Sequence, residues 1–463
     1  MARIFVISNR VTVPSSGSEV HAGGLEVALR AILKKHQCVW VGWSGRSVAE
    51  SEPIEVRKTT VAGTDYIVTD LSERDLEEYY HGFANRVLWP VLHYRQDLAE
   101  FSRRDLSGYF RVNDRFADIL AQELRPDDLL WVHDYHLMPL AQVLRARGIA
   151  NRIGFFLHIP MPPPEVIAAL PHHERVIGAL AEYDLLGFQT ETDTANFARY
   201  LARQFGSSPH LGALPNGLRL GTFPVGIDTA EFQRMARAAH DHKVIRRLAE
   251  TSANLVIGVD RLDYSKGLKL KFEAFEHVLK NHQEWCGEVT FLQITPKSRS
   301  AIAEYAAMEQ ELDTLSGRIN ADYGNALWTP IRFVTRTYDR ETLAGFFSIS
   351  RVGVVTPLRD GMNLVAKEYV AAQDPSDPGI LVLSEFAGAA ADLRAALRVN
   401  PNDPESVGAA IHRGLIMSLA ERKARHRDLL QAVLETDISY WAEHFIARLR
   451  VGPVRRAQAF AAE

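Results

Sequence analysis

Short runs of apolar residues alternate with amphipathic stretches along the whole chain. The apolar runs are rich in Val, Ile and Phe, and they show no clean alternation of polar and apolar positions. That pattern is typical of parallel strands that are buried on both faces of a sheet. It predicts strands at residues 4–8, 38–43, 66–69, 129–133, 153–158, 185–189, 255–259, 289–294, 331–334, 352–356, 380–383 and 397–400.

The stretches between these runs carry apolar residues at the spacing of amphipathic helices. The clearest are residues 25–35, 114–123, 137–147, 192–204 and 268–281, and residues 404–449 are almost wholly helical in pattern. Regular alternation of strand and helix predicts an α/β protein with doubly wound parallel sheets.

The predicted strands are too many for one such sheet, so we expect two domains in this chain of 463 residues. The strand signal is weakest at residues 206–227, where Gly and Pro are frequent, and a charged helical stretch follows at residues 229–250. The domain boundary is therefore predicted after residue 227.

Charge and cysteine content narrow the class of protein. Lys and Arg total 53 against 57 Asp and Glu, and without a basic stripe a nucleic-acid partner is not expected. Cys38 and Cys286 lie in apolar surroundings, which predicts two buried free thiols in a reducing compartment. Since no stretch reaches the roughly 18–20 apolar residues of a membrane span, we expect a cytoplasmic protein with no membrane partner.

Polar residues stand at the strand ends of the first half, where open α/β sheets bind their ligands. Arg10 follows the first strand, the pair Gly23 and Gly24 precedes a predicted helix, and Asp134 and His158 end two further strands. These residues could hold a phosphate and sugar hydroxyls. Each also has a plainer interpretation, as a solvated arginine, a glycine turn, a helix N-cap and a structural histidine.

Cations recur at the strand ends of the second half. Arg261 and Lys266 share the loop after residues 255–259, and Arg299 follows the strand at residues 289–294. Two cations in a strand-to-helix loop suit a diphosphate, although they could also form surface ion pairs with neighbouring Asp residues. Their recurrence in a net-acidic chain favours an anionic ligand.

The strongest pattern is VGVVTPLRDGMNLVAKE at residues 352–368. A buried strand is followed by Gly361, which allows close backbone approach, and a helix is predicted to begin near Asn363. The free amides of the helix start would face an anion. Asp360 could accept hydrogen bonds from sugar hydroxyls, and Glu368 from a ribose. Read alone, the block predicts that an anionic sugar ligand meets the start of a helix.

The motifs as a set resemble one family. The chain closely resembles the trehalose-6-phosphate synthases from its first strand to about residue 450. The resemblance rests on SNR, AGGL, EYY, VLWP, WVHDYHL, RIGFFLHIPMP, DLLGFQT, RLDYSKG, GRIN and TPLRDGMNLVAKEYVAAQ.

This resemblance implies a GT-B fold, in which two Rossmann-like domains face each other across a cleft. Residues 1–227, joined by a C-terminal helix at about 438–452, would bind the acceptor, and residues 228–437 the nucleotide sugar. The implied reaction is the retaining transfer of glucose from a nucleotide-glucose, most commonly UDP-glucose, to glucose 6-phosphate. No metal or other cofactor is implied, and a homo-oligomer, dimer or tetramer, is expected.

The family's site residues carry over motif by motif. The catalytic set would be Arg261, Lys266, His158 and Asp360. The donor set would be Gly23, Gly24, Arg261, Lys266, Tyr338, Asp360, Gly361, Met362, Asn363, Leu364, Val365 and Glu368, with His158 on the donor glucose. The acceptor set would be Arg10, Tyr80, Trp89, Asp134 and Arg299.

Several alternatives stay open at the level of sequence. Tyr338 stands where the family often has Phe, which leaves the choice among UDP-, GDP- and ADP-glucose open. The acceptor could be glycerol 3-phosphate or a cyclitol phosphate, and some relatives are non-catalytic regulatory subunits. A phosphorylase with pyridoxal phosphate on a lysine is a rival from another enzyme class.

Overall fold

The computed structural model describes residues 2–14, 36–206, 217–252, 254–296 and 303–451. The chain divides into two compact units: unit 1 is Met1–Pro224 with Trp441–Glu463, and unit 2 is Val225–Tyr440. The sequence-based prediction places the domain boundary after residue 227, and the observed division falls after residue 224. The prediction also joins a helix at about 438–452 to the first domain, and in the structure the chain returns to unit 1 at Trp441.

Unit 1 is built on one sheet with the strand order β3-β4-β2-β1-β5-β6-β7-β8. Neighbouring strands are parallel except for β3 and β4. The order β4-β2-β1-β5-β6-β7 is that of a Rossmann-like sheet, whose switch point lies between β1 and β5. The strands are β1 (Ile4–Arg10), β2 (Cys38–Val48), β3 (Val56–Val61), β4 (Thr64–Ser72), β5 (Leu129–His133), β6 (Arg152–Phe156), β7 (Leu185–Phe188) and β8 (Arg219–Thr222).

The helices of unit 1 connect these strands. They include a long segment of wide, π-type turns, η1, a form that is frequent at functional sites. The helical segments are α2 (Glu73–Asp75), η1 (Leu76–Leu88), α3 (Trp89–Leu92), η2 (Gln96–Leu98), α4 (Arg103–Glu123), η3 (Tyr135–Leu137), α5 (Leu140–Ala146), α6 (Pro164–Ile167), α7 (His173–Val176), η4 (Gly178–Glu182) and α8 (Glu191–Phe205), and α17 (Ile438–Arg450) returns from unit 2.

Unit 2 contains a second sheet with the order β11-β10-β9-β12-β13-β14, all parallel. This is again the Rossmann order, with its switch point between β9 and β12. The strands are β9 (Asn254–Val259), β10 (Val289–Ile294), β11 (Ile331–Val334), β12 (Val352–Val355), β13 (Ile380–Ser384) and β14 (Leu397–Val399). The predicted α/β class with two doubly wound sheets is confirmed.

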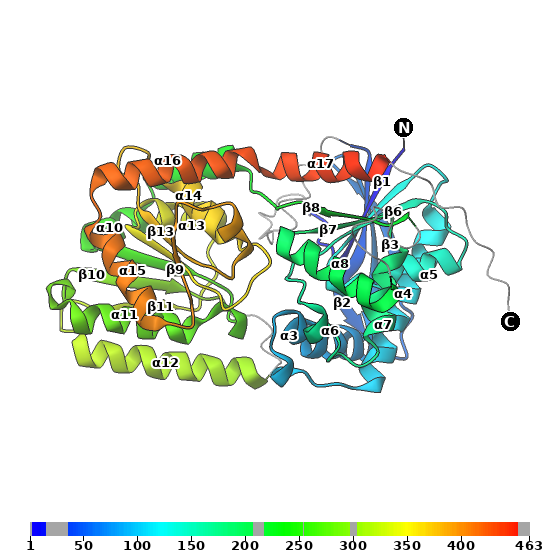
Figure 1. Cartoon of the computed structure of the whole chain (residues 1–463), viewed down its shortest axis with the longest axis horizontal. Helices are drawn as coiled ribbons and strands as arrows, with labels where there is room; N and C mark the ends of the chain where they lie inside the picture. The colour runs from blue at the N-terminus through cyan, green and yellow to red at the C-terminus, as the bar shows by residue number, and fades with distance from the viewer. Residues whose placement is uncertain (1, 15–35, 207–216, 253, 297–302, 452–463) are drawn as a thin grey trace. The chain divides into compact units, whose positions relative to one another are not determined.

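Helices cover both faces of this second sheet (Figure 1). One layer contains α11 and α15, and the other contains α9, α13 and α14. Helix α11 buries Leu268, Phe272, Phe275 and Leu279 in the core, as its sequence periodicity predicts. The helical segments are α9 (Thr229–Ala239), α10 (Lys243–Thr251), η7 (Tyr264–Lys266), α11 (Leu268–Asn281), η8 (Gln283–Trp285), α12 (Ala303–Tyr323), α13 (Arg340–Ser348), α14 (Leu364–Ala372), η9 (Gly388–Ala391), α15 (Pro404–Ile416) and α16 (Leu419–Glu435).

The sequence-based prediction missed two strands. The predicted strands all occur, but β3 and β8 are additional, and β3 runs antiparallel to β4. Strand β3 has the sequence VRKTTV and is mostly exposed at the sheet edge, while the residues of β8 are only partly buried. Edge strands tolerate polar residues, so neither carries the apolar run by which buried strands are recognised.

Some predicted helices differ in extent. The helical stretch at 229–250 is broken between α9 and α10, because the chain turns after Ala239 and the amide of His242 donates to the carbonyl of Ala239. Helix α4 begins at Arg103, well before the predicted start at residue 114. Ser102 caps this helix, because its side chain accepts a hydrogen bond from the amide of Asp105. The helix predicted at 25–35 lies outside the described residues.

The cysteine prediction is half wrong. Both cysteines are free, and Cys38 is buried in β2, but Cys286 is exposed. Cys286 directly follows η8 in the turn before β10, so its apolar neighbours in sequence do not cover it.

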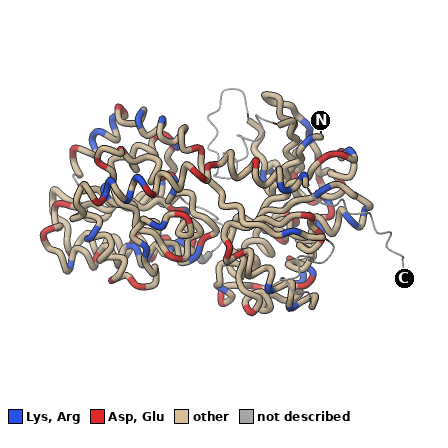
Figure 2. Tube along the Cα trace, turned by 45° about the horizontal axis from the view of Figure 1, so that its top comes forward, with Lys and Arg blue, Asp and Glu red and all other residues tan. Residues whose placement is uncertain are grey.

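Two further features of the described part of the chain are its lack of a membrane-spanning helix and its mixed distribution of charge. None of its helices is long and apolar enough to cross a bilayer. Figure 2 shows segments of both charge signs intermingled along each unit. The near balance of acidic and basic residues in the sequence is therefore also a local balance.

Candidate active site

The loop from β9 to α11 carries the two cations that the sequence singles out. Arg261 is exposed, whereas Lys266 is buried at the end of η7. Gly267 follows with φ +63°, and a Cβ atom there would lie 2.9 Å from the carbonyl oxygen of Thr356. Glycine is therefore required at this position, because it lets the loop pack against the segment that follows β12.

Asp360 joins this loop to the loop between β12 and α14. Its carboxylate accepts a hydrogen bond from Lys266 Nζ in a partly buried ion pair. It also accepts from the amide of Gly361 and from Asn363 Nδ2, each at 3.0 Å. The predicted catalytic pair Lys266 and Asp360 is thus brought together, although the two residues are far apart in sequence.

The start of α14 has no side-chain cap. Asn363 occupies the N-cap position with φ +68°, and its side chain makes no capping hydrogen bond, because its amide group points to Asp360. Helices α9, α13, α15 and α16 of the same unit are each capped by an Asp or Ser side chain, whereas α10 and α11, like α14, have no side-chain cap. An uncapped helix start offers backbone donors and a partial positive charge to an anion.

The other predicted donor residues surround this helix start. Met362 is buried, while Leu364, Val365 and Glu368 are partly exposed along α14. Burial raises the pKa of the Glu368 carboxyl, and the nearby Arg340 guanidinium opposes that shift. Tyr338 lies just before α13, with its ring 5.1 Å from that of Phe346.

A buried ion pair that the sequence-based prediction did not include lies at the start of the loop that carries Arg261 and Lys266. Lys271 of α11 donates from Nζ to Asp260 Oδ2 at 2.5 Å, and both side chains are almost completely buried. Gln293 Nε2 donates to the same oxygen at 3.2 Å. The signal for this pair was available as a lysine on the apolar face of an amphipathic helix, among Leu268, Phe272 and Phe275.

Ring contacts connect the predicted acceptor residues of unit 1. The guanidinium of Arg10 lies 5.9 Å from the Trp43 ring, which is 5.7 Å from the ring of Tyr80 on η1. Tyr80 stacks on His136 at 5.8 Å. Arg10 ends β1, Trp43 pairs with it from within β2, and Tyr80 and His136 come from η1 and η3, so the cluster forms at the carboxyl end of β1.

Asp134, Trp89 and His158 complete this group. Trp89 is buried and its ring lies 5.7 Å from that of Tyr135, the neighbour of Asp134. Asp134 has φ +73°, which is rare for a residue other than glycine, and its carboxylate accepts the amide of His158 at 3.3 Å. The structure thus brings the described acceptor candidates and His158 into one contiguous cluster.

The imidazole of His158 is held neutral by its surroundings. Burial lowers its pKa to about 3, and its Nε2 lies 3.1 Å from Nδ1 of His133. Burial also lowers the pKa of His133, with the adjacent His158 as a further cause. His133 was not singled out from the sequence, where it reads as the last residue of a buried strand.

The low pKa of His158 predicts a loss of stability in acid. Between pH 6.5 and about 3 the unfolded chain binds a proton that the folded chain does not, so stability falls as the pH is lowered through that window. At pH 5 the effect amounts to about 2 kcal/mol. Urea unfolding at pH 7 and pH 5 should show a larger acid loss for the wild type than for His158→Asn. Equal losses would contradict the neutral assignment.

Three predicted site residues cannot be placed. Gly23, Gly24 and Arg299 lie outside the described residues. Their assignment to the donor diphosphate and the acceptor phosphate stays a prediction.

By distance, one group of described side chains could ligate a metal: His282, Glu284 and His412. The two imidazole rings are stacked 3.5 Å apart and nearly parallel, so their in-plane lone pairs do not converge on one ion. Trp285 Nε1 also donates to Nδ1 of His412 at 3.0 Å. The group lies at the far end of α11 from Lys266, and its geometry fits a surface contact better than a metal centre.

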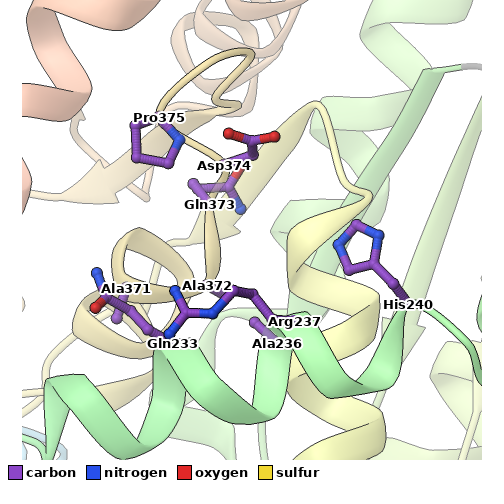
Figure 3. Close-up of a pocket in the computed structure, with 9 residues that line it drawn as sticks. All are labelled: Gln233, Ala236, Arg237, His240, Ala371, Ala372, Gln373, Asp374 and Pro375. Carbon is purple, nitrogen blue, oxygen red and sulfur yellow. The ribbon is translucent and has the colours of Figure 1, made fainter.

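A cavity of about 430 Å³ lies between α9 and the segment that follows α14 (Figure 3). Gln233 and Arg237 of α9 and His240 directly after it line one side of the cavity, and Gln373 and Asp374 line the other. The polar atoms of Gln373 bond to the backbone of Phe347 and Gly379, and Asp374 accepts the amide of Ser376. None of the predicted site residues lines this cavity.

Comparison with known proteins identifies the family. The sequence model of glycosyltransferase family 20 matches residues 6–451. A trehalose-6-phosphate synthase of Sinorhizobium fredii is 49% identical over 453 residues, which cover 96% of this chain and 98% of that protein.

Two solved structures are similar over nearly their whole length. One is a UDP-forming α,α-trehalose-phosphate synthase from Burkholderia xenovorans in complex with glucose 6-phosphate, with TM-score 0.92, 44% identity and coverage of 97% and 100% of the two chains. The other is an Escherichia coli chain bound with UDP-2-fluoro glucose, with TM-score 0.91, 44% identity and coverage of 98% and 100%. The resemblance and the GT-B fold are confirmed, and the chain belongs to glycosyltransferase family 20.

Proposed function

We propose that the chain transfers a glucosyl group from UDP-glucose to glucose 6-phosphate with retention, yielding α,α-trehalose 6-phosphate and UDP. The similar proteins named above support these substrates, since one is solved with glucose 6-phosphate and one with a UDP-sugar analogue. From this chain itself, the proposal rests on the uncapped start of α14 beside the pair Lys266 and Asp360. That arrangement suits a sugar diphosphate at the switch point of unit 2.

The donor site is proposed at this switch point. The free amides at the start of α14 and the Lys266 ammonium face the diphosphate, and Arg261 adds a second positive charge. Asp360 accepts from hydroxyls of the donor sugar, and His158 is assigned to the same sugar on the resemblance alone. Glu368 lies further along α14, where its carboxylate accepts from the ribose.

The acceptor site is proposed on the cluster in unit 1. Arg10 is exposed at the end of β1 and binds the phosphate of the acceptor, assisted by Tyr80. The ring of Trp89 and the carboxylate of Asp134 line the acceptor sugar. Arg299 is assigned to the same phosphate on the resemblance alone.

We infer that Asp360 binds the donor sugar and does not act as a nucleophile. Its oxygens already accept hydrogen bonds from Lys266, Gly361 and Asn363, which stabilise the carboxylate negative charge. We therefore propose direct attack by the acceptor hydroxyl on the face from which the diphosphate leaves. The new C–O bond forms as the bond to the diphosphate breaks, and the diphosphate oxygen takes the proton.

The conditions of the reaction follow from the same assignments. Since Lys266, Arg261 and helix amides supply positive charge at the diphosphate, the proposed reaction needs no metal ion. Two free cysteines agree with a cytoplasmic location. A homo-oligomer, dimer or tetramer, is proposed on the resemblance.

Glu368 is expected to determine donor affinity. Glu368→Gln replaces one acceptor oxygen by an amide donor and should raise the KM for UDP-glucose about tenfold with little change in kcat, because a ribose contact is uniform in ground and transition state. The exposed Glu250→Gln on α10 is the matched control. An unchanged KM would remove Glu368 from the nucleotide site.

A donor-by-acceptor matrix tests the proposed function. UDP-, GDP- and ADP-glucose are each combined with glucose 6-phosphate, glycerol 3-phosphate and a cyclitol phosphate, and nucleoside diphosphate release is measured. Product from UDP-glucose and glucose 6-phosphate is expected, with the α,α linkage identified by NMR. Turnover only with another acceptor would replace the proposed substrate, and no turnover with any pair would indicate a non-catalytic chain.

A further inference from the structure

A pair of adjacent histidines lies at the carboxyl ends of β5 and β6. His133 is completely buried as the last residue of β5, and its strand pairs with β6 so that His133 lies opposite Phe156. His158 follows two residues after Phe156 and is partly exposed. Nδ1 of His133 and Nε2 of His158 are 3.1 Å apart.

Only one proton can occupy this nitrogen–nitrogen contact, because both rings are neutral at physiological pH. If His133 donates from Nδ1, its Nε2 carries a lone pair, and His158 holds its proton on Nδ1. If His158 donates from Nε2, the proton of His133 sits on its own Nε2. The surroundings of His133 Nε2 distinguish these two tautomers.

Among the described residues, His133 Nε2 is buried without a hydrogen-bond partner. The ring of His133 contacts those of Trp131 at 4.6 Å and Trp441 at 6.2 Å, and the Nε1 atoms of both tryptophans are also buried without a partner. Indole Nε1 is only a donor. A proton on His133 Nε2 would therefore place a third unpaired donor in this cluster, whereas a lone pair there complements the two indole donors.

We infer that His133 is a positioning residue: it donates its Nδ1 proton to Nε2 of His158 and thereby holds His158 as the tautomer that donates from Nδ1. The inference deepens the proposed function, since it rests on His158 contacting the donor sugar. A neutral imidazole in this tautomer donates a hydrogen bond to a sugar oxygen and keeps no positive charge beside the donor. Without His133, the tautomer of His158 is not set.

Other contacts hold the backbone of His158, so His133 acts on the ring. The amide of His158 donates to Asp134, and its carbonyl accepts from Gln189 Nε2 at 3.4 Å. Phe156 and Trp441 pack against the His158 ring at 4.7 and 6.0 Å. Replacing His133 is therefore expected to leave the main chain of His158 in place and to release the tautomer.

The direct test is the position of the protons. Nitrogen-15 NMR of the whole chain with labelled histidine, with His158 assigned by comparison with His158→Asn, should show Nδ1 protonated and Nε2 unprotonated at pH 7.5. Protonated Nε2 in His158 would overturn the inference. This measurement needs no turnover, so it stays decisive if UDP-glucose or glucose 6-phosphate is not a substrate.

Kinetics of two variants give the second test. His133→Leu removes the donor and should lower kcat/KM for UDP-glucose about 10- to 100-fold, whereas the KM for glucose 6-phosphate changes little. His133→Asn keeps an N–H near the Nδ1 position and should retain activity within about threefold. Equal activity of the two variants would contradict the inference.

The matched control is His173→Leu. His173 also forms a hydrogen bond through Nδ1 in unit 1, to the Tyr200 hydroxyl at 2.9 Å, and it is not a predicted site residue. Its removal should leave kcat/KM unchanged. If His133→Leu does not fold, as judged by its thermal midpoint, the NMR measurement on the wild type decides alone.

Discussion

Replacing Lys266 by methionine is expected to lower kcat about 10²- to 10³-fold. Lys266 is buried at the switch point of unit 2, where its ammonium meets Asp360 and lies near the open start of α14. A preorganised charge that stabilises a leaving group contributes about this much, because it is worth more in a water-poor site than in solution. Methionine keeps most of the side-chain volume, so packing changes little. Initial rates of UDP release at saturating substrates measure the effect.

The matched control for this variant is Lys269→Met. Lys269 is on the first turn of α11, half-exposed and paired with Glu311, an ion pair of the kind that contributes little. The control should keep wild-type kcat. If Lys266→Met also kept wild-type kcat while remaining folded, the positive charge on the leaving diphosphate would have to come from other residues.

The position of Lys266 was predictable, but its partner was not. A strand-to-helix loop with two cations follows from the local pattern, as does the glycine loop before α14. The contact between Lys266 and Asp360 spans 94 residues and depends on the strand order that places β9 beside β12. The pattern of a single sequence predicts the strands and their ends, but it does not predict which strands are neighbours in the sheet.

The same limit explains which parts of the fold were missed. Buried parallel strands are continuous apolar runs, so those strands of both units could be predicted. Strand β3 pairs only with β4 and exposes most of its residues, and its pattern is that of a loop. Strand register, the break between α9 and α10, and the exposure of Cys286 are set by tertiary packing.

Buried polar residues are a second feature of the site that the sequence pattern did not predict. His133 in WVH and Lys271 among apolar helix positions each read as an isolated polar residue, for which a structural role is the simplest interpretation. Their partners, His158 and Asp260, come from different elements. Because burying a polar group without a partner is unfavourable, a polar residue at a core position is itself a signal that a partner exists.

The second large effect is expected from Lys271→Met, on stability. The variant leaves Asp260 buried, and among the described residues Gln293 Nε2 is the side-chain donor that still reaches it. Removing one member of a buried ion pair destabilises a protein by about 3–5 kcal/mol, because the other charge stays desolvated. The expected result is a lowering of the free energy of unfolding by that amount, measured by urea unfolding of the whole chain followed by circular dichroism.

The double variant Lys271→Met with Asp260→Asn distinguishes a stability loss caused by the unpaired carboxylate from one caused by altered packing. If the loss comes from the unpaired carboxylate, the double variant should recover most of it, whereas a loss caused by packing would persist. Lys280→Met, at an exposed position near the end of α11, should change stability by less than about 0.5 kcal/mol.

Asp260 immediately precedes Arg261, so the single variant Lys271→Met should also lower kcat by disordering the loop that carries Arg261 and Lys266. An unchanged kcat with lowered stability would show that the buried pair supports the fold and leaves the site untouched.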